Sequence, residues 1–267
     1  MSIPRRTPAG YAEFDGDKQF ATTLARGITL LGCFTPREPL LSNKDLASLT
    51  GLPKATVSRL TYTLTQMGLL RWHRRSQRYQ IGAAVLALGY PLLGSMLLRQ
   101  IARPLMNELA DHTGGSVALS TRDRLSMVYL ETSRSRSSLS DQKSDVGFSL
   151  PLIASVTGRA YLVACDVSDR SSLLNEIRLR QPELWSEYEA KLEPAFTHYR
   201  SKGFCVAFGD TRKDLWAISA PIRRPRHEDI LVLTCAVQSH RIKPRQFGDN
   251  LGPRLAALAQ ALEQVVG

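Results

Sequence analysis

Near the N-terminus the apolar residues recur at the spacing of a helix. Leu24, Ile28 and Leu31 recur at i, i+4 and i+7, so they lie on one face of an amphipathic helix expected over 20–34. Two prolines close behind this stretch predict a loop. The chain therefore begins its ordered part with a helix followed by an irregular connection.

A second helix is predicted directly after that loop. Ser42 suits its N-cap, and Asp45 three residues later gives a weak form of the capping box. Leu46 and Leu49 supply the apolar face, and Gly51 suits the C-terminal end. These signals predict a short helix that stops at a glycine.

A third helix follows with almost no connection. Pro53 fits the first position of a helix, and Val57, Leu60 and Leu64 form its inward face, with Gly68 as the expected stop. Two helices joined by a tight Gly-Leu-Pro turn are typical of a helix-turn-helix.

A basic hairpin is predicted after the third helix. Leu69-Leu70 and Tyr79–Ile81 have the pattern of strand ends, and the turn His73–Arg78 between them is rich in arginine. A hairpin directly after a helix-turn-helix predicts a winged helix, whose cationic tip would contact a phosphate backbone or a minor groove.

The second half of the chain changes its pattern to mixed helix and strand. A long helix, interrupted near Pro104, is expected as a linker between two domains. The remaining expected elements are strands at 116–120 and 125–131, an exposed polar loop at 132–145, a helix at 184–203, strands at 217–223 and 230–238 around a basic turn at 224–229, and a helix at 251–266. This order predicts an α+β domain with a twisted antiparallel sheet flanked by helices.

Composition restricts the class of protein. Hydrophobic residues make up 43% and charged residues 22% of the 267 residues, as in soluble globular proteins. No apolar run approaches the roughly 20 residues of a spanning helix, and the segment 1–19 is expected to be a disordered polar tail and no signal peptide. The four cysteines are widely spaced, so we expect buried free thiols and a cytoplasmic protein.

Positive charge is concentrated in the predicted winged helix. The formal net charge is +11, and residues 42–90 hold seven basic residues against one acidic residue. More than half of the excess charge therefore lies in less than a fifth of the chain. A polyanion is the expected partner, and double-stranded DNA fits a helix-turn-helix.

The third helix carries the chemistry expected of a groove reader. In a helix-turn-helix the N-terminal turns of the second helix enter the major groove, where arginine, serine and threonine contact bases or phosphates. The predicted DNA-binding residues are Ser42, Lys44, Pro53, Lys54, Ala55, Thr56, Ser58, Arg59, Tyr62, Arg74, Arg75, Gln77 and Arg78.

These motifs resemble a known family. The run from 20 to 89, with TLARGITLLGCF, LASLTGLPKATVSRLTYTLTQMGLL and YQIGAAVLALG, resembles the DNA-binding domain of IclR-type bacterial transcriptional regulators. The stretches 149–164 and 199–222 and the C-terminal helix extend the resemblance. It implies a winged helix-turn-helix domain at 20–89, a linker helix at 90–113 and an effector-binding and oligomerisation domain at 114–267. It also implies dimers through the N-terminal helices, often paired into tetramers.

The resemblance further implies a pocket for a small organic acid on one side of the sheet. The positions that match the family pocket, with one neighbouring phenylalanine, are Ala154, Thr157, Gly158, Phe204, Phe208, Asp210, Asp214, Ala217, Cys235 and Val237. Many relatives place serines on the last strand, so Cys235 and Val237 favour a hydrophobic or aromatic acid. As alternatives, Phe208 and Cys235 belong to the core, and Asp210 and Asp214 only cap or form ion pairs.

No motif of catalysis or of metal or cofactor binding occurs. The histidines are dispersed, and GxSxG, P-loop and GxGxxG patterns are lacking. The leading prediction is a ligand-responsive transcription factor with no cofactor, no metal and no enzymatic activity. One alternative is a DNA-binding protein whose C-terminal half only oligomerises, and the other is an enzyme that carries a DNA-binding domain.

Overall fold

The computed structural model describes residues 11, 14, 16–135, 144–224 and 229–266. The chain divides into two compact units, residues 1–95 and 96–267, and each is described here by itself. Most of the predicted tail 1–19, most of the predicted loop at 132–145 and the centre of the basic turn 224–229 lie outside the described residues.

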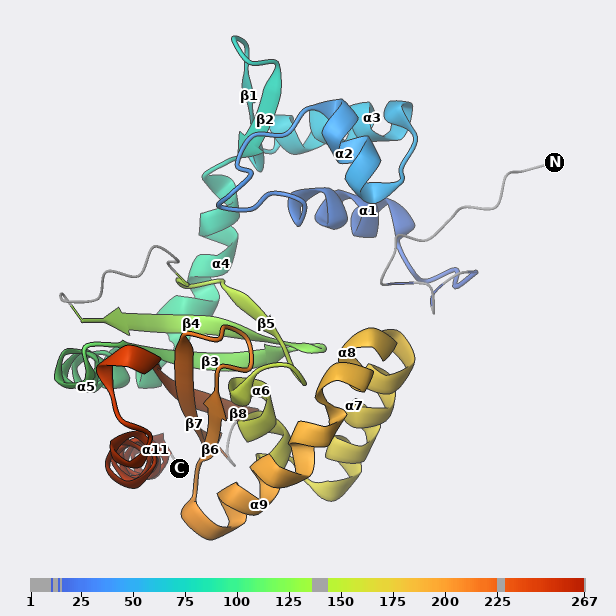
Figure 1. The fold of residues 1–267 in the computed structure, drawn as a ribbon. Helices are drawn as coiled ribbons and strands as arrows, with labels where there is room; N and C mark the ends of the chain where they lie inside the picture. The colour runs from blue at the N-terminus through green and yellow to red at the C-terminus, as the bar shows by residue number, and fades with distance from the viewer. Residues whose placement is uncertain (1–10, 12–13, 15, 136–143, 225–228, 267) are drawn as a thin grey trace. The chain divides into compact units, whose positions relative to one another are not determined.

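The first unit is a winged helix-turn-helix, as predicted (Figure 1). β1 and β2 pair as an antiparallel hairpin, and a core of leucine and valine side chains joins the helices to it. Its elements are α1 (Thr22–Leu31), α2 (Asn43–Thr50), α3 (Lys54–Gln66), β1 (Leu70–His73), β2 (Arg78–Ile81) and α4 (Ala84–Ser95).

Helix α1 buries a different face from the one that its leucine and isoleucine spacing indicated. Ala25 and Leu30 are buried, whereas Leu24 is 64% and Ile28 53% exposed. Small side chains let α1 approach α3 closely, since a Cβ added at Gly27 would lie 4.0 Å from the Leu60 side chain. The larger apolar residues of α1 therefore remain on the surface of the chain.

The turn between α2 and α3 follows the predicted signals closely. Ser42 caps α2 and forms the complete capping box with Asp45, and Gly51 ends the helix at φ +67°. Pro53 is the N-cap of α3 and not its first helical residue, so that prediction was off by one position. Gly68 follows the end of α3 at φ +72°.

The predicted linker helix is divided at a different place. α4 ends at Ser95, and α5 (Leu97–Thr113) begins after Met96, so the break does not lie at Pro104. Pro104 lies inside α5 and is exposed. Among the described residues, no single helix is long and apolar enough to cross a membrane; α4 and α5 reach that length and composition only when taken together.

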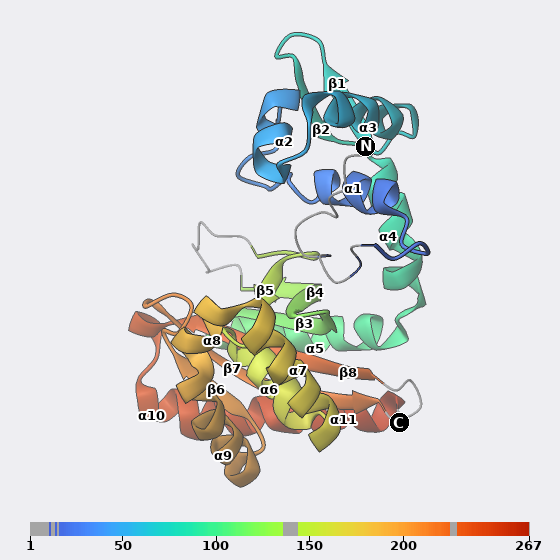
Figure 2. The same ribbon diagram turned by 90° about the vertical axis from the view of Figure 1, so that its right-hand side faces the viewer.

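The second unit is built on a six-stranded antiparallel sheet with the order β5-β4-β3-β8-β7-β6 (Figures 1 and 2). The short edge strands β5 and β6 were not predicted. The strands are β3 (Ser116–Asp123), β4 (Ser126–Arg134), β5 (Ser149–Pro151), β6 (Cys205–Phe208), β7 (Leu215–Arg224) and β8 (Asp229–Gln238).

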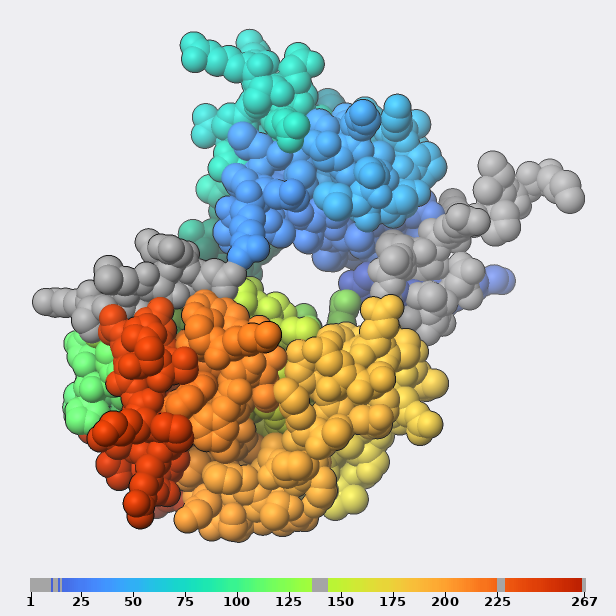
Figure 3. All heavy atoms as spheres, in the orientation of Figure 1, coloured from blue at the N-terminus to red at the C-terminus, as the bar shows by residue number. Residues whose placement is uncertain are grey.

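Helices cover both faces of this sheet. Successive residues of β8 face opposite sides: Thr234 contacts Thr157 of α6 (Val156–Ala164), and Cys235 contacts Thr113 of α5. α11 packs against β7 and β8 as well as α5, and in Figure 3 the C-terminal segment (red) lies directly beside the β6–β7 segment (orange). The other helices are α7 (Val167–Arg180), α8 (Pro182–Tyr188), α9 (Leu192–Lys202), α10 (Pro244–Gln246), a π-helical turn (Phe247–Leu251) and α11 (Gly252–Val266).

The helix predicted at 184–203 is therefore two helices, α8 and α9, and α7 was missed. α6 and the helices after it pack over a hydrophobic core on one face of the sheet, with Ile153, Ile177 and Phe196 among its buried side chains. The α+β architecture with an antiparallel sheet is as predicted.

Candidate DNA-binding surface and ligand cavity

Helix α3 separates its residues cleanly into a buried and an exposed face. Val57, Thr61 and Leu64 face the core of the first unit. Of the thirteen predicted DNA-binding residues, Lys44, Pro53, Lys54, Ala55, Ser58, Arg59, Tyr62, Arg74, Arg75 and Gln77 are exposed, and Ser42, Thr56 and Arg78 are partly buried. The exposed face of α3 thus offers hydroxyl and cationic groups with nothing bulky at its first turn.

Two of these residues, Ser42 and Arg78, also hold the motif together. The Ser42 amide donates to Asp45 Oδ2 at 2.9 Å, and Arg78 Nη1 donates to the same oxygen at 3.1 Å and to the carbonyl of Leu40 at 2.9 Å. Hydrogen bonds from Ser42, together with the nearby Arg78 charge, lower the pKa of Asp45. Ser42 and Arg78 therefore fix α2 to the start of β2.

The hairpin places its basic tip on a short, ordered turn. Gln77 adopts φ +54°, which closes the turn after Arg74 and Arg75. One residue pair below the turn, Trp72 packs on Tyr79 with ring centroids 4.5 Å apart. This aromatic pair, which the sequence reasoning did not single out, supports the strands below the two exposed arginines.

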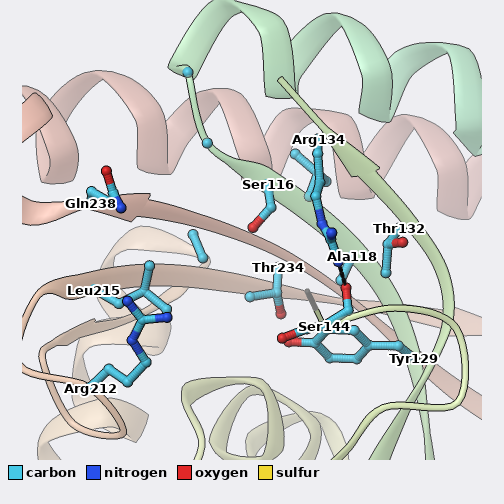
Figure 4. Close-up of a pocket in the computed structure, with 14 residues that line it drawn as sticks. Ser116, Ala118, Tyr129, Thr132, Arg134, Ser144, Arg212, Leu215, Thr234 and Gln238 are labelled. Atoms are coloured by element: carbon cyan, nitrogen blue, oxygen red, sulfur yellow. Dashed lines mark hydrogen bonds between the residues drawn. The ribbon is translucent and has the colours of Figure 1, made fainter. Parts of the chain in front are cut away.

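The second unit contains a cavity of about 200 Å³ on the α6 face of the sheet. A smaller lobe of about 80 Å³ adjoins it and shares Tyr129 and Thr234 among its lining residues. Figure 4 shows the residues of the smaller lobe, including Tyr129, Thr234 and Arg212, which also line the larger cavity. The combined space suits a small organic molecule with polar substituents.

Three buried hydroxyl groups form a chain beneath the cavity. Thr157 Oγ1 lies 2.9 Å from Thr234 Oγ1, which lies 2.8 Å from Ser219 Oγ. The three residues come from α6, β8 and β7, and each is at most 4% exposed. Because these buried hydroxyls hydrogen-bond to one another, they fix α6 on the sheet at the wall of the cavity.

The first turn of α6 forms one wall of the cavity. Ser155 caps the helix by accepting the Gly158 amide at 3.0 Å, and Ser155, Val156 and Thr157 line the space. A side chain at position 158 would lie 1.8 Å from the Leu152 carbonyl oxygen, so glycine is required there. A helix N-terminus provides N–H groups and a positive dipole end, which favour an anion.

A cluster of three charged residues lies beside the cavity, and Arg159 is its buried member. Asp210 lines the cavity and forms ion pairs with Arg159, which is 1% exposed, and with Lys191 at 2.7 Å. Arg159 also donates to the carbonyl oxygens of Ile153 and Ala154. Asp210 is therefore engaged by two cations, and its loop is fastened to α6.

Tyr129 is the aromatic residue common to both lobes. Its backbone exchanges hydrogen bonds with the segment before β5, and its ring meets the Phe148 ring edge-on at 5.5 Å. Burial raises the pKa of the Tyr129 hydroxyl to about 12. At neutral pH the side chain is a neutral hydrogen-bond donor and acceptor within reach of the cavity.

Two predicted pocket residues, Cys235 and Val237, lie on the face of the sheet opposite to the cavity. Thr234 and Ala236 line the cavity, so Cys235 and Val237 point to the α5 and α11 side and are fully buried there. The Cys235 thiol contacts Thr113 at 3.8 Å, and its pKa is raised to about 12 by burial. The inference of an apolar floor from these two residues therefore fails.

Five further predicted residues are not among the lining residues. Ala154 lies in the core just before α6, Gly158 is buried within α6, and Phe204 lies in the interior next to His198 and Gly252. Phe208 is the exposed member of an aromatic cluster with Trp216 and the buried Phe247, and Asp214 forms a surface pair with Arg212. Thr157, Asp210 and Ala217 do line the cavity. Sequence reasoning missed Tyr129, Phe148, Thr234 and Ala236; a single threonine in the apolar run LVLTCAVQ was the available signal.

All four cysteines are free thiols, as expected. Cys165, Cys205 and Cys235 are buried and Cys33 is partly buried. In the described ranges no group of three or more histidine, cysteine or acidic side chains is arranged to hold a metal ion.

Two family models cover most of the chain. Residues 23–74 match the IclR helix-turn-helix domain, and residues 91–264 match the C-terminal domain of the bacterial transcriptional regulator IclR. The second match alone spans more than half of the chain, and together they account for both units.

Individual relatives agree with the family models. The HTH-type transcriptional regulator TsaQ1/TsaQ2 of Comamonas testosteroni is 34% identical over 242 residues, which are 90% of this chain and 87% of the relative. The crystal structure of an IclR family transcriptional regulator from Brucella abortus has a TM-score of 0.83 and 38% identity, and covers 94% of each chain. An IclR homologue from Microbacterium hydrocarbonoxydans complexed with 4-hydroxybenzoate shares the fold, with a TM-score of 0.69, 19% identity and coverage of 91% and 99%. The chain belongs to the IclR family of bacterial transcriptional regulators.

Proposed function

We propose that this regulator binds operator DNA as a dimer or tetramer and changes its operator affinity when a small aromatic acid occupies the cavity of its second unit. The cavity supports this most directly, because a helix N-terminus, a tyrosine and a phenylalanine line the same space. The three parts of the proposal rest on different residues and are argued separately.

The DNA-binding part rests on the exposed face of α3. Lys54, Ser58 and Arg59 project from the first two turns, where a helix in the major groove contacts bases and phosphates. Arg74 and Arg75 at the hairpin tip supply charge for the phosphate backbone. Ser42 and Arg78 act mainly by fixing the motif, and any contact with DNA would come in addition to their internal hydrogen bonds.

The oligomeric part rests on apolar side chains that the single chain leaves uncovered. Leu24 and Ile28 of α1 are exposed, and none of the residues of α4 is buried although most of them are apolar. An exposed apolar surface of this kind marks an association site. A second copy of the chain fits best, since a two-fold dimer matches two half-sites of an operator.

The effector part rests on the size and polarity of the cavity. A dry cavity of about 150 Å³ accommodates a benzene ring, and this cavity measures about 200 Å³. Tyr129 and Phe148 offer aromatic contacts, while the N-terminus of α6 favours a carboxylate. The Microbacterium homologue binds 4-hydroxybenzoate, and a hydroxyl on the ring of such a ligand suits the polar smaller lobe here.

We also infer that the cavity senses its ligand and does not convert it. Ser155 donates to the Pro151 carbonyl and caps α6, and the hydroxyls of Thr157, Thr234 and Ser219 bond to one another. None of these hydroxyls has a histidine within hydrogen-bonding distance among the described contacts. Their hydrogen bonds favour a structural role over nucleophilic attack. A cytoplasmic location accords with this role.

A thermal-shift titration of the full chain with 4-hydroxybenzoate, benzoate and aliphatic acids tests the effector part. A ligand that binds only the folded state stabilises it, by about 2.7 kcal/mol at 100 times its Kd. We expect the hydroxylated aromatic acid to raise the melting temperature most. No shift with any of these acids would favour the alternative in which the second unit only oligomerises.

A further inference from the structure

A β-bulge lies in the cavity wall. Leu119 pairs with Glu131 and Ser120 pairs with Tyr129, so Leu130 of β4 has no partner on β3. In a regular strand, residues three positions apart point to opposite faces. The bulge is what lets both Tyr129 and Thr132 line the cavity.

The side chain of Glu131 lies on the other face of the same strand, against α5. Its Oε2 forms an ion pair with Arg99, at 2.8 Å from Nε, and accepts hydrogen bonds from Arg103 Nη2 at 2.7 Å and Nε at 3.1 Å. Its Oε1 accepts the backbone amide of Thr132 at 3.2 Å. The side chain is only 6% exposed, so solvent screens these charge-assisted bonds weakly.

Arg99 also contacts the bulge itself, because its Nε–H donates a hydrogen bond to the carbonyl oxygen of Leu130 at 3.0 Å. Arg99 and Arg103 belong to the first two turns of α5, which begins at Leu97, one residue after the second unit starts at Met96. The bulged segment of β4 thus lines the cavity on one face of the sheet and is hydrogen-bonded to the first helix of this unit on the other.

We propose that Glu131 is a positioning residue that transmits occupancy of the cavity to the N-terminal turns of α5. The inference rests on the proposed function of the cavity. A ligand against Tyr129 and Thr132 shifts the bulge, and the carboxylate carries that shift to Arg99 and Arg103 because it bonds the strand and the helix at once. α5 is the part of this unit nearest in sequence to the DNA-binding unit.

In the test, a larger side chain occupies part of the cavity in place of a ligand. Ala236 lines both lobes, so Ala236→Leu fills part of the cavity in the full chain. Hydrogen exchange of the backbone amides in 97–106 is then followed by mass spectrometry. We expect the exchange rates of these amides to change about 5-fold or more, which is the lower end of typical coupling between sites. Adding Glu131→Gln to Ala236→Leu should remove most of that change.

Glu108→Gln is the matched control, because Glu108 is also on α5 but pairs with Arg254 of α11 at an exposed position. It should leave the effect of Ala236→Leu in place. Where Glu131→Gln lowers stability too far, Arg103→Gln serves, since the Arg103 side chain is half exposed.

Two results would overturn the inference: no change in 97–106 on filling the cavity, or the same change with and without Glu131. Neither depends on finding an effector. A blank ligand titration therefore contradicts the proposed function alone, and a blank exchange experiment contradicts the role of Glu131 alone.

Discussion

Single side chains determine what each unit can recognise, and Arg59 is the clearest case. It is exposed in the second turn of α3, one position beyond Ser58 and away from the buried Val57. Arginine there can donate two hydrogen bonds to a guanine. We predict that Arg59→Ala weakens binding to the operator by about 1–3 kcal/mol, measured by fluorescence anisotropy.

Arg37→Ala is the control for this change, because Arg37 is exposed in the loop before α2 and is not among the predicted contacts. Its loss should alter operator affinity little. Equal effects of the two substitutions would mean that Arg59 acts only through its charge, and unchanged binding in Arg59→Ala would contradict the assignment of α3.

Tyr129 gives a prediction for alkaline pH. Burial raises its pKa to about 12 from a reference value of 10.0, so between these values the unfolded chain loses the proton and the folded chain keeps it. Deprotonation therefore stabilises the unfolded state. The free energy of unfolding falls as pH rises from 10 to 12, by about 2–3 kcal/mol for a shift of this size.

Tyr129→Phe removes that pH dependence. The variant should therefore lose less of its free energy of unfolding between pH 9 and pH 11 than the unchanged protein, measured by urea denaturation at both values. Other alkaline groups, including Cys205 and Cys235 with pKa values of about 12, are common to both proteins and cancel in the difference. Parallel losses in the two proteins would show that Tyr129 is not desolvated.

Residue-level reasoning from the sequence succeeded where the signal was local. The Ser42–Asp45 capping box and the glycine stop at Gly51 depend on a few neighbouring residues. It failed on β8, because helices cover both faces of the sheet and both sets of alternating side chains are buried. Hydropathy therefore does not tell which face of β8 lines the cavity, and it could not correct the match with the family pocket, which placed Cys235 there in place of Thr234.

At the scale of elements, the buried hydroxyl chain determines how α6 sits on the sheet. Thr234→Val keeps the shape of the side chain but leaves the hydroxyls of Thr157 and Ser219 without their shared partner. Leaving a buried polar group unsatisfied costs about 1–3 kcal/mol. We predict a loss of this size in the free energy of unfolding, measured by urea denaturation.

Thr197→Val is the control, because Thr197 is exposed on α9. It should change the free energy of unfolding by less than about 0.5 kcal/mol. A Thr234→Val protein as stable as the original would mean that the two remaining hydroxyls find other partners. The ligand affinity should also fall, since Thr234 lines both lobes.

The elements themselves were predictable to different degrees. The helix-turn-helix and the hairpin have short-range signals, and the structure bears them out. The β-bulge at Leu130 and the edge strands β5 and β6 arise from long-range pairing, which no local pattern specifies. The buried face of α1 was misjudged because Leu24 and Ile28, the larger apolar residues, are not the ones that pack inside.

At the scale of the whole molecule, the proposed dimer can be tested at the exposed apolar residues of α1. Changing both Leu24 and Ile28 to glutamate should weaken dimerisation by about 100-fold or more, because a buried Leu or Ile contributes about 1.5–3 kcal/mol. Sedimentation velocity measures the result. Leu49→Glu, at an exposed apolar position of α2, is the control and should leave the mass unchanged.

The most direct test of a ligand-responsive regulator measures DNA and effector together. The full chain first selects its site from a pool of random duplexes, and its Kd for that site is measured by fluorescence anisotropy with and without a saturating acid found by thermal shift. The account predicts a two-fold symmetric site and a change in Kd of about 5- to 150-fold. An acid that binds the protein but leaves the Kd unchanged would contradict it.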